Sequence, residues 1–369
     1  MRVPVAALIA TFGIRKVLAA RLPSHSAYVI PGTPSTGIST VQLTSTGTQL
    51  DAPKLSPVNS TVFDWWYWDA VADDLSASVV LTVFTAEPSG LWTGIPVTGS
   101  TTWFGAMFTF TNGTPWTVFL PANSLAVTTL GDGSSGAFNG VNAGWHGSSD
   151  LSKYVVAIDE PEAGIQGTFT LASTAPAHLP CSASIHEPQS YEVSPDFGWA
   201  NAVPDANSEV DFILGGSKLK FSGPGYHDKN WGCKPANVTM KSWYWGHARV
   251  GPYSVVWFTV VAPNGNEYLS SYVASRGKVI TSQCGGIIVR PTGANAVYPP
   301  TPTSAPPEGF HVEQEVEGKG TLVLEVTNER LITLVENTAY RWIGSVSAGF
   351  RNQTQWQGVG LYEQFAFDI

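Results

Sequence analysis

The segment Phe63–Ala70, with the sequence FDWWYWDA, places three tryptophans and a tyrosine between the carboxylates of Asp64 and Asp69. An acid in an apolar, aromatic cavity can anchor or polarise a substrate, because a hydrogen bond that strengthens as charge develops lowers a reaction barrier. The segment is typical of a β-strand, in which successive side chains alternate between two faces. The two faces are expected to carry Asp64, Trp66 and Trp68 on one side and Trp65, Tyr67 and Asp69 on the other.

Both faces of this strand must be covered by other parts of the chain or must line a cavity, because each face is aromatic and carries an acid. A buried indole N–H also needs an acceptor, so a cluster of tryptophans is an unfavourable way to fill an ordinary core. Two interpretations stay open from this segment alone: a tryptophan-rich core strand, or one wall of a ligand site.

A second polar cluster lies in Gly223–Gly232, with the sequence GPGYHDKNWG. The adjacent His227 and Asp228 could work as an acid–base pair, or could form a hydrogen-bonded brace that holds a turn. The brace is the interpretation that we favour for this motif taken alone. The other aromatic and polar members of the cluster are Tyr226, Asn230 and Trp231.

A third motif, Ser242–Val250 with the sequence SWYWGHARV, also predicts a strand. Its two faces carry Trp243, Trp245, His247 and Arg249 on one side and Tyr244, Gly246, Ala248 and Val250 on the other. Packing in an apolar core explains most of these residues, but it explains Arg249 poorly.

The composition predicts a mainly β protein with a large apolar interior. Of the 369 residues only 13% are charged, whereas Gly and Pro number 37 and 26, and Trp, Tyr and Phe number 14, 12 and 17. Short β-like runs separated by Pro, Gly and Asn recur from Val62 onward, as in a sandwich or barrel, and no window has a helical apolar period. The net charge of −9 argues against nucleic acid as a partner, since nucleic-acid binding normally requires a basic patch.

The chain is long enough for two β domains. A Ser/Thr/Pro-rich arm is predicted at residues 21–50, an N-terminal β-sandwich-like domain at residues 51–200 and a C-terminal domain at residues 201–369. The polar, turn-rich stretch His186–Asn207 is the expected junction between the two domains.

The N-terminal residues 1–20 resemble a secretory signal peptide, although two cations interrupt an apolar run that is too short to span a membrane. On this feature the secretory pathway is favoured over the cytoplasm. Four Asn-x-Ser/Thr sequons, about the number that chance provides, are candidate glycosylation sites. They are Asn59, Asn112, Asn237 and Asn352.

No motif predicts a metal, a nucleotide cofactor or a hydrolase nucleophile. Residues 131–136 match G-x-G-x-x-G, but no helix follows to supply an anion-binding N-terminus, so a flexible loop is the better interpretation. The seven histidines lack metal-ligand spacing, and a G-x-S-x-G elbow is absent. We therefore expect neither cofactor nor metal. The cysteines allow one disulfide and a free thiol, or three free thiols; they are Cys181, Cys233 and Cys284.

In combination and order, the three aromatic motifs resemble those of a known family. An early D-W-W-Y-x-D strand, G-Y-H-D-x-N-W-G in mid-chain and a W-Y-W-G-x-A-x-V-G-P-Y hairpin are similar to carotenoid hydratase-like proteins with a lipocalin-type fold, and most similar to fungal Diels–Alderases. The likeness covers residues 55–369. It implies a β-sandwich packed against a C-terminal lipocalin-like β-barrel, with the substrate between them or in the barrel mouth.

The resemblance implies an intramolecular 4+2 cycloaddition of a polyene in fungal secondary metabolism, on a polyketide or polyketide–amino acid hybrid of the decalin or cytochalasan type. Such an enzyme holds diene and dienophile in one geometry and polarises the dienophile carbonyl, without nucleophile, metal or redox cofactor. Two other functions stay open: a hydratase that protonates an isoprenoid alkene, and a lipocalin-like carrier of an apolar ligand. The small-molecule substrate is the only partner implied.

Carried over by motif, the resemblance implies that Asp64, Trp231 and Tyr244 are catalytic. The substrate-binding wall that it implies consists of Trp65, Trp66, Trp68, Tyr226, Trp245, Trp342 and Tyr362. The residues expected to brace the domain junction are His227, Asp228 and Asn230. We therefore expect Asp64, Trp231 and Trp245 to converge on one cavity of small-molecule size.

Overall fold

Two antiparallel β-sheets make up most of the described chain. The computed structural model describes residues 24–91, 97, 99–335 and 338–368, so the predicted signal peptide at residues 1–20 lies outside the described residues. Helix within the described residues is limited to three short elements: α1 (Ala236–Thr239) and two 3-10 turns, η1 (Pro88–Gly90) and η2 (Pro161–Ala163). The prediction of an all-β fold is confirmed.

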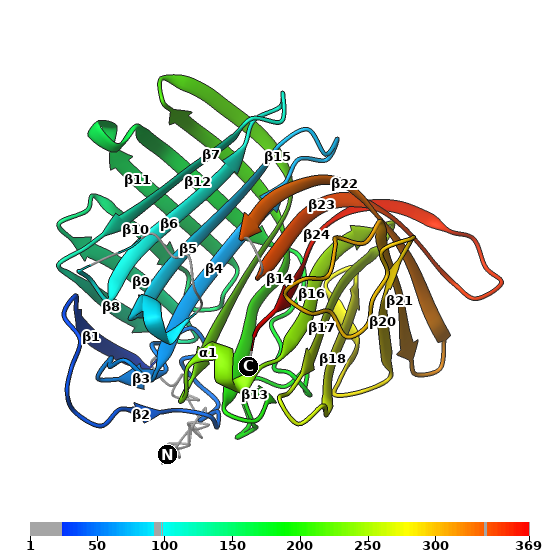
Figure 1. Ribbon diagram of the computed structural model, residues 1–369, viewed down its shortest axis with the longest axis horizontal. Helices are drawn as coiled ribbons and strands as arrows, with labels where there is room; N and C mark the ends of the chain where they lie inside the picture. The colour runs from blue at the N-terminus through cyan, green and yellow to red at the C-terminus, as the bar shows by residue number, and fades with distance from the viewer. Residues whose placement is uncertain (1–23, 92–96, 98, 336–337, 369) are drawn as a thin grey trace, which may run out of the picture.

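The first sheet takes thirteen strands from the N-terminal two thirds of the chain (Figure 1, blue to green). They are β1 (His25–Pro31), β4 (Phe63–Val71), β5 (Ser78–Ala86), β6 (Thr102–Thr109), β7 (Pro115–Pro121), β8 (Ser124–Leu130), β9 (Gly133–Asn139), β10 (Ala143–Gly147), β11 (Lys153–Glu160), β12 (Ile165–Ser173), β13 (Glu192–Ser194), β14 (Phe197–Leu214) and β15 (Ser217–Gly232). Their spatial order is β1-β8-β9-β10-β11-β12-β14-β15-β4-β5-β6-β7, and β13 pairs with β14. A separate pair is formed by β2 (Thr40–Val41) and β3 (Leu55–Ser56).

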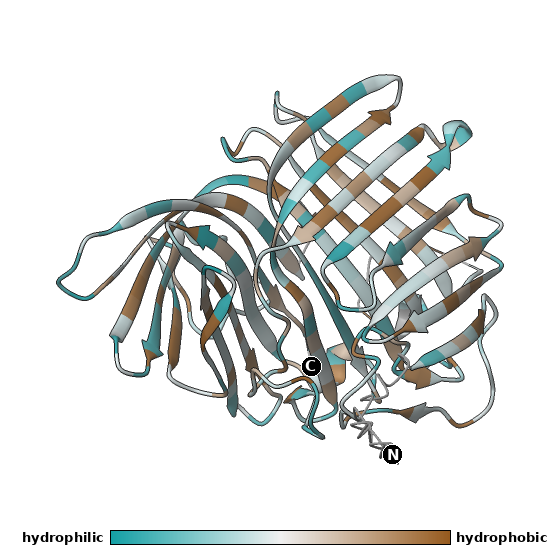
Figure 2. Ribbon diagram, turned by 180° about the vertical axis from the view of Figure 1, so that it is seen from behind, coloured by the Kyte–Doolittle hydropathy of each residue, from teal (hydrophilic) through white to brown (hydrophobic). Residues whose placement is uncertain are grey.

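The first sheet bends back on itself, so that its two halves pack face to face around one core. Between ring centroids, Trp66 on β4 lies 5.2 Å from Trp145 on β10, and Phe108 on β6 lies 4.9 Å from Phe212 on β14. Four strands separate β4 from β10 in the sheet, so these contacts require two layers. Strands such as β8 and β11 alternate between buried and exposed residues. Hydrophobic and hydrophilic residues are interspersed along several strands of this sheet in Figure 2. This arrangement agrees with the sandwich-like unit expected from the sequence.

The second sheet takes nine strands from the C-terminal third of the chain (Figure 1, green to red). They are β16 (Ser242–Val250), β17 (Tyr253–Val261), β18 (Glu267–Ser275), β19 (Lys278–Gln283), β20 (Ile287–Thr292), β21 (Gly309–Val316), β22 (Gly320–Val335), β23 (Ala339–Phe350) and β24 (Trp356–Ala366). Their order is β19-β18-β17-β16-β24-β23-β22-β21-β20. Because β19 and β20 form the two edges, the pairing among described residues does not close this sheet into the predicted lipocalin-like barrel. One face of the sheet has its own core, and the other faces the first sheet.

The chain passes from one sheet to the other at residues 233–241, so the boundary predicted near residue 200 is wrong. Ala200 lies inside β14, which pairs with β15 along most of its length. In the second half of the stretch that suggested a linker, polar residues are buried and paired: the Asn201 side-chain amide donates to the His227 carbonyl, and Asp205 forms an ion pair with Arg249. Polarity at these positions therefore reflects internal hydrogen bonds, not a solvated junction.

The predicted arm at residues 21–50 is also part of the fold where it is described. β1 pairs with β8 at one edge of the first sheet, from His25 opposite Leu130 to Pro31 opposite Ser124. Farther along, the Gln42 carbonyl accepts a hydrogen bond of 2.8 Å from Trp231 Nε1.

The two sheets pack through the outer face of β4 and β15 against the facing side of β16 and β24. All nine residues of β4 are buried, which confirms that both of its faces are covered. As alternation predicted, Trp66 and Trp68 lie in the first core, whereas Trp65 and Tyr67 lie in the interface.

Buried polar contacts also tie the sheets together. His247 Nε2 on β16 lies 2.8 Å from Asp69 Oδ1 on β4. Arg249 Nη2, two residues farther along β16, lies 2.7 Å from Asp205 Oδ1 on β14. The arginine that core packing left unexplained therefore links the two sheets.

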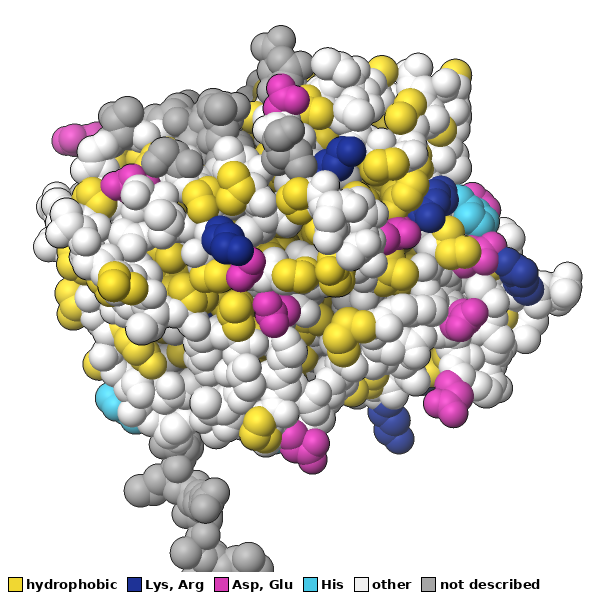
Figure 3. All heavy atoms as spheres, turned by 60° about the horizontal axis from the view of Figure 1, so that its bottom comes forward, with side chains coloured by type: hydrophobic (Ala, Val, Ile, Leu, Met, Phe, Trp, Pro, Cys, Tyr) yellow, Lys and Arg dark blue, Asp and Glu magenta, His cyan; other side chains and the backbone are white. Residues whose placement is uncertain are grey.

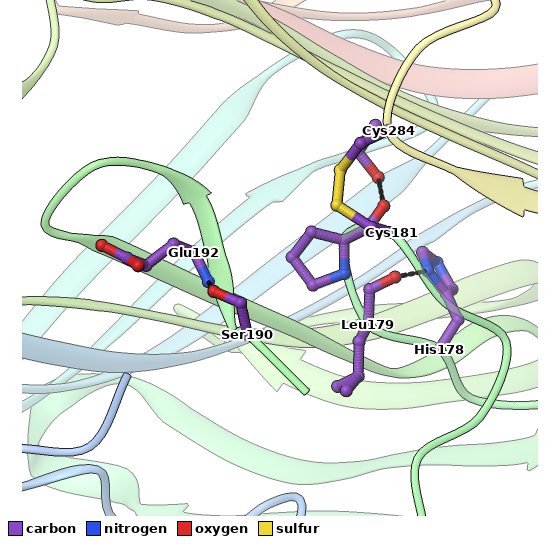
Figure 4. Close-up of a disulfide and its surroundings, with 8 residues drawn as sticks. His178, Leu179, Cys181, Ser190, Glu192 and Cys284 are labelled. Carbon is purple, nitrogen blue, oxygen red and sulfur yellow. Dashed lines mark hydrogen bonds between the residues drawn. A yellow bond between two sulfur atoms is a disulfide. The ribbon is translucent and has the colours of Figure 1, made fainter. Parts of the chain in front are cut away.

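A disulfide between Cys181 and Cys284 joins the same two parts of the chain (Figure 4). Cys181 precedes β13, and Cys284 lies between β19 and β20. Beside the bond, the His178 ring stacks on Tyr272 of β18, with centroids 4.1 Å apart. Of the two cysteine arrangements that the sequence allowed, the structure has one disulfide and one free thiol, Cys233.

No helix in the described part of the chain is long and apolar enough to cross a membrane. On the face shown in Figure 3, charged side chains are few and scattered, and Lys and Arg do not gather into a patch. This distribution agrees with the low charged fraction of the sequence, 13%.

The core of the first sheet contains buried charges. Lys229 Nζ lies 2.5 Å from Asp64 Oδ1 and 3.2 Å from the centroid of the Trp66 ring. Asp64 Oδ2 accepts a hydrogen bond of 2.8 Å from the Lys54 backbone N–H. Burial lowers the pKa of Lys229 to about 8, although the Asp64 carboxylate opposes this effect. Asp64 and Lys229 therefore form an ion pair that is buried from solvent.

Asp64→Asn is expected to lower the free energy of unfolding by about 3–5 kcal/mol, because the buried Lys229 ammonium loses its carboxylate. Urea unfolding at about pH 6, where Lys229 is charged, measures the difference. The exposed Asp73→Asn is the matched control and is expected to stay within about 0.5 kcal/mol of the wild type. Equal stability of all three proteins would contradict a structural role for the pair.

Candidate active site between the two sheets

A cavity of about 530 Å³ lies between the two sheets. Its walls come from β4, β5, β6, β7 and β15 of the first sheet and from β16, β17, β22, β23 and β24 of the second. Small-molecule sites usually measure roughly 300–1,000 Å³. The space therefore fits a ligand of drug-like size held by both sheets.

Much of the cavity wall is aromatic. Phe84 and Trp103 stack with ring centroids 3.9 Å apart, and Phe119 packs edge-on against Trp103 at 5.9 Å. Trp65 lies 5.8 Å from Phe84. Aromatic faces carry partial negative charge, so such a wall suits a flat unsaturated ligand or one that develops positive charge.

The carboxyl of Asp228, on β15, lines this cavity. Its Oδ2 accepts hydrogen bonds of 2.7 Å from Trp199 Nε1 and from the Tyr226 hydroxyl, and its Oδ1 accepts one of 3.1 Å from the Asn230 amide. Burial raises the pKa of Asp228 to about 7, although the bonds from Trp199 and Tyr226 favour the carboxylate and limit the rise. Both protonation states are therefore populated near neutral pH, as a general acid requires.

An ion pair, Arg341 with Glu363, lines the cavity from the second sheet. The two residues are directly opposite each other on β23 and β24, and Arg341 Nη2 and Nε donate to Glu363 Oε2 at 2.6 and 2.8 Å. Trp243 Nε1 donates to Glu363 Oε1 at 3.0 Å. Burial lowers the pKa of Arg341, but the Glu363 carboxylate outweighs this effect and leaves the pKa above its ordinary value. Arg341 is therefore a fixed cation whose Nη1 makes no hydrogen bond to the described residues.

Two further donors line the cavity, the Tyr67 hydroxyl and the Trp245 indole N–H. Tyr67 interacts with Asp69 and Trp245 with Tyr226, but neither donor makes a hydrogen bond of good geometry to a described residue. Both groups are buried, and the two rings meet edge to face with centroids 5.4 Å apart. A buried donor without an acceptor is unfavourable. A ligand oxygen in the cavity would satisfy either group.

The end of β22, Leu331–Val335, forms a partly exposed wall of the cavity, so that the mouth of the cavity includes this segment. The segment reaches across to β6, where the Thr333 hydroxyl lies 3.8 Å from Met107 Sδ (Figure 1, orange). Leu331 and Leu334 remain 44% and 56% exposed, so the mouth is apolar.

Four of the residues predicted for the site or the brace line the cavity: Trp65, Trp245, Asp228 and Asn230. Tyr226 does not line the cavity itself, but its hydroxyl donates a hydrogen bond to Asp228, which does. His227 faces the other way, into the first core, where its Nε2 lies 3.2 Å from Asp51 Oδ1.

The expectation that Asp64 and Trp231 converge with Trp245 on one cavity is wrong. Asp64 pairs with Lys229, and Trp231 packs in the first core beside Tyr191. Strand parity is the reason, because neighbours of the cavity-lining positions in β4 and β15 point to the opposite face. The tryptophans placed in the same core by this alternation are Trp66 and Trp68.

Tyr244, Trp342 and Tyr362 do not line the cavity either; they pack in the core of the second sheet. The Tyr244 hydroxyl donates to the Val297 carbonyl, and the Tyr362 hydroxyl donates to the Thr327 carbonyl. Backbone carbonyls therefore accept the hydrogen bonds of both tyrosine hydroxyls.

The sequons lie in different environments. Asn112 and Asn352 are exposed and Asn59 is partly exposed, whereas the Thr239 hydroxyl of the Asn237 sequon is buried and bonds to backbone carbonyls. Glycosylation stays a prediction.

The sequence motifs missed several cavity residues. Tyr67 and Trp243 belonged to recognised motifs and share the faces of Trp65 and Trp245, so alternation alone could have found them. Arg341 and Glu363 had no local signal, because only strand pairing brings together two residues that are separated by a hairpin.

The fold and the cavity define a two-sheet β protein with a small-molecule site between its sheets. The sequence pattern of the Diels-Alderase-like family matches residues 32–286. Quinolone epoxide rearrangement protein penF of Penicillium thymicola is 37% identical over 367 residues, covering 95% of this chain and 98% of the relative. Quinolone epoxide rearrangement protein asqO of Emericella nidulans is 36% identical over 337 residues, covering 90% and 91%.

Among solved structures, CghA with Sch210972 has the same fold, with a TM-score of 0.75 at 16% identity over 93% of this chain and 99% of that chain. The chain belongs to the Diels-Alderase-like family. The resemblance inferred from the three motifs is confirmed at this level, and the wider hydratase-like grouping stays a prediction.

The wild-type protein is expected to lose stability relative to Asp228→Asn as the pH rises from about 4 to about 7. The unfolded carboxyl ionises near its ordinary pKa of about 4, whereas the folded one stays protonated up to its pKa of about 7, so folding binds a proton in this window. The difference reaches at most about 4 kcal/mol. Urea unfolding of both proteins across this range measures it, and parallel pH dependences would contradict the raised pKa.

Proposed function

We propose that the protein is a cofactor-free isomerase that rearranges an epoxide carried by a quinolone or a related nitrogen heterocycle. The observation that carries this proposal is Asp228, an acid with a pKa of about 7 in the wall of an aromatic cavity. Two relatives that match nine tenths or more of the chain are named as quinolone epoxide rearrangement proteins, which supports the choice of substrate class.

In this mechanism the protonated Asp228 carboxyl donates its proton to the epoxide oxygen, and one C–O bond breaks with its electron pair moving to that oxygen. A hydride or alkyl group then migrates with its bonding pair from the adjacent carbon to the cationic carbon. Return of the hydroxyl proton to Asp228 leaves a carbonyl group and regenerates the acid. Substrate and product are isomers, so the reaction consumes neither water nor a redox partner.

The rest of the cavity suits this chemistry. The faces of Trp65, Phe84 and Trp103 stabilise the carbocation, because aromatic rings attract positive charge. Glu363 neutralises Arg341, so the ion pair does not oppose the developing cation. Arg341 Nη1 is then available to hold the carbonyl oxygen of the heterocycle and thereby to set the distance between the epoxide and Asp228.

An intramolecular 4+2 cycloaddition of a polyene is the second candidate. The family description supports it, as do the Tyr67 and Trp245 donors, which could polarise a dienophile carbonyl. In that reaction the shape of the cavity matters more than the protonation state of Asp228.

Purified protein incubated with a quinolone that carries an epoxide side chain is expected to yield an isomer of unchanged mass, identified by mass spectrometry and NMR. Asp228→Asn is expected to lower kcat/KM by at least about a hundredfold, since general acid catalysis contributes roughly 10²–10⁴-fold. The exposed Asp73→Asn is the matched control and is expected to keep full activity. Full activity in folded Asp228→Asn would contradict the mechanism.

The same assay separates the alternatives. Oxygen from labelled water in the product would indicate a hydratase, and tight binding without conversion would indicate a carrier. Conversion of a linear polyene, with the epoxide left unchanged, would establish the cycloaddition instead.

A further inference from the structure

The cavity acid is connected to an interface contact that does not itself line the cavity. Asp69 on β4 and His247 on β16 are buried between the sheets, with His247 Nε2 lying 2.8 and 3.1 Å from the two Asp69 carboxylate oxygens. Neither residue is part of the cavity wall, and the mechanism above does not use them. Because the pair lies behind the cavity wall, its role depends on the side chains that it contacts there.

The Asp69–His247 pair packs against the ring of Tyr226, whose hydroxyl donates a hydrogen bond to Asp228. The His247 ring stacks on the Tyr226 ring, with centroids 4.7 Å apart and planes 16° from parallel. Trp245 meets Tyr226 edge to face at 5.0 Å. A phenol ring packed on a face and an edge has little freedom to turn. The Tyr226 hydroxyl is therefore fixed where it donates to Asp228 Oδ2 at 2.7 Å.

We propose that His247, oriented by Asp69, is a positioning residue: by stacking on Tyr226 it fixes the hydroxyl that donates to Asp228. Three of the four groups belong to the first sheet and His247 to the second, so docking of the second sheet completes the surroundings of an acid that the first sheet carries. The catalytic importance of this contact rests on the proposed function, but the placement of the hydroxyl does not.

Other titratable groups also face this cluster. Asp228 is influenced by His227 on its own strand and by Glu363 on β24, and Tyr226 is influenced by Asp69 on β4. The remaining neighbours on the interface are Tyr67 on β4 and Arg341 on β23. None of these groups is changed in the decisive variant, which replaces the imidazole that packs on Tyr226 and pairs with Asp69 by an uncharged amide.

That variant is His247→Gln, which keeps a side-chain N–H for Asp69 and removes the stacked ring. The titration midpoint of Asp228 is expected to rise by about one pH unit, the size expected when one hydrogen bond to a carboxylate is weakened. Carboxyl ¹³C NMR against pH measures the midpoint without substrate, and the signal missing from Asp228→Asn identifies the residue. Tyr226→Phe is expected to give the same rise, and the double variant no more than either single change.

Arg249→Gln is the matched control, because it breaks the other polar tie between the sheets, to Asp205, without touching Tyr226. It is expected to lower stability and leave the Asp228 midpoint unchanged. If His247→Gln does not fold, the double variant Asp69→Asn/His247→Gln replaces it, because its two amides can pair without a buried charge. The double variant is expected to show the same rise in the Asp228 midpoint.

An unchanged midpoint in either folded His247 variant, or an equal shift in Arg249→Gln, would overturn the positioning role. The readout is the difference between variant and wild type, whatever the wild-type midpoint. A wild-type midpoint far from neutrality would instead contradict the general-acid role of Asp228 in the proposed function.

Discussion

The burial of β4 and of residues 223–232 of β15 on both faces is the constraint on which the rest of the structure depends. One face of each strand lies in the core of the first sheet, and the other lies against the second sheet. Because neither face meets water, every charged side chain on these strands needs a partner from another element. Asp64 forms an ion pair with Lys229, and Asp69 pairs with His247. The Asp228 carboxyl accepts hydrogen bonds, among them one from the Tyr226 hydroxyl.

Because side chains alternate along a strand, residues of one sequence motif face either the interface between the sheets or the core of the first sheet. In β4 the odd-numbered positions from Trp65 to Asp69 face the interface, and the even-numbered positions face the core. In β15 the interface positions include Asp228, and the core positions include Lys229 and Trp231. A single residue of register therefore separates the positions that are paired in the core from the positions that line the cavity.

The sequence was sufficient for the fold class and for the alternation of the main motifs, because both depend on local composition and period. It was insufficient for choosing the functional face, since Asp64 and Asp69 have equally aromatic surroundings within the strand. The place of Asp228 in the cavity wall was also out of reach, because it depends on how the two sheets pack and not on residue type. The Arg341–Glu363 pair and the sheet boundary depended on long-range strand pairing, which leaves no signature in a short window.

The end of β22 contributes a cavity wall that is only partly buried. Leu331–Val335 form one wall of the cavity, yet this segment lies on a different sheet from Asp228. Its two leucines are about half exposed, so the positions tolerate changes of size and polarity without a packing penalty. Substitutions in this five-residue stretch would therefore change the shape of the cavity and leave the hydrogen bonds of Asp228 in place.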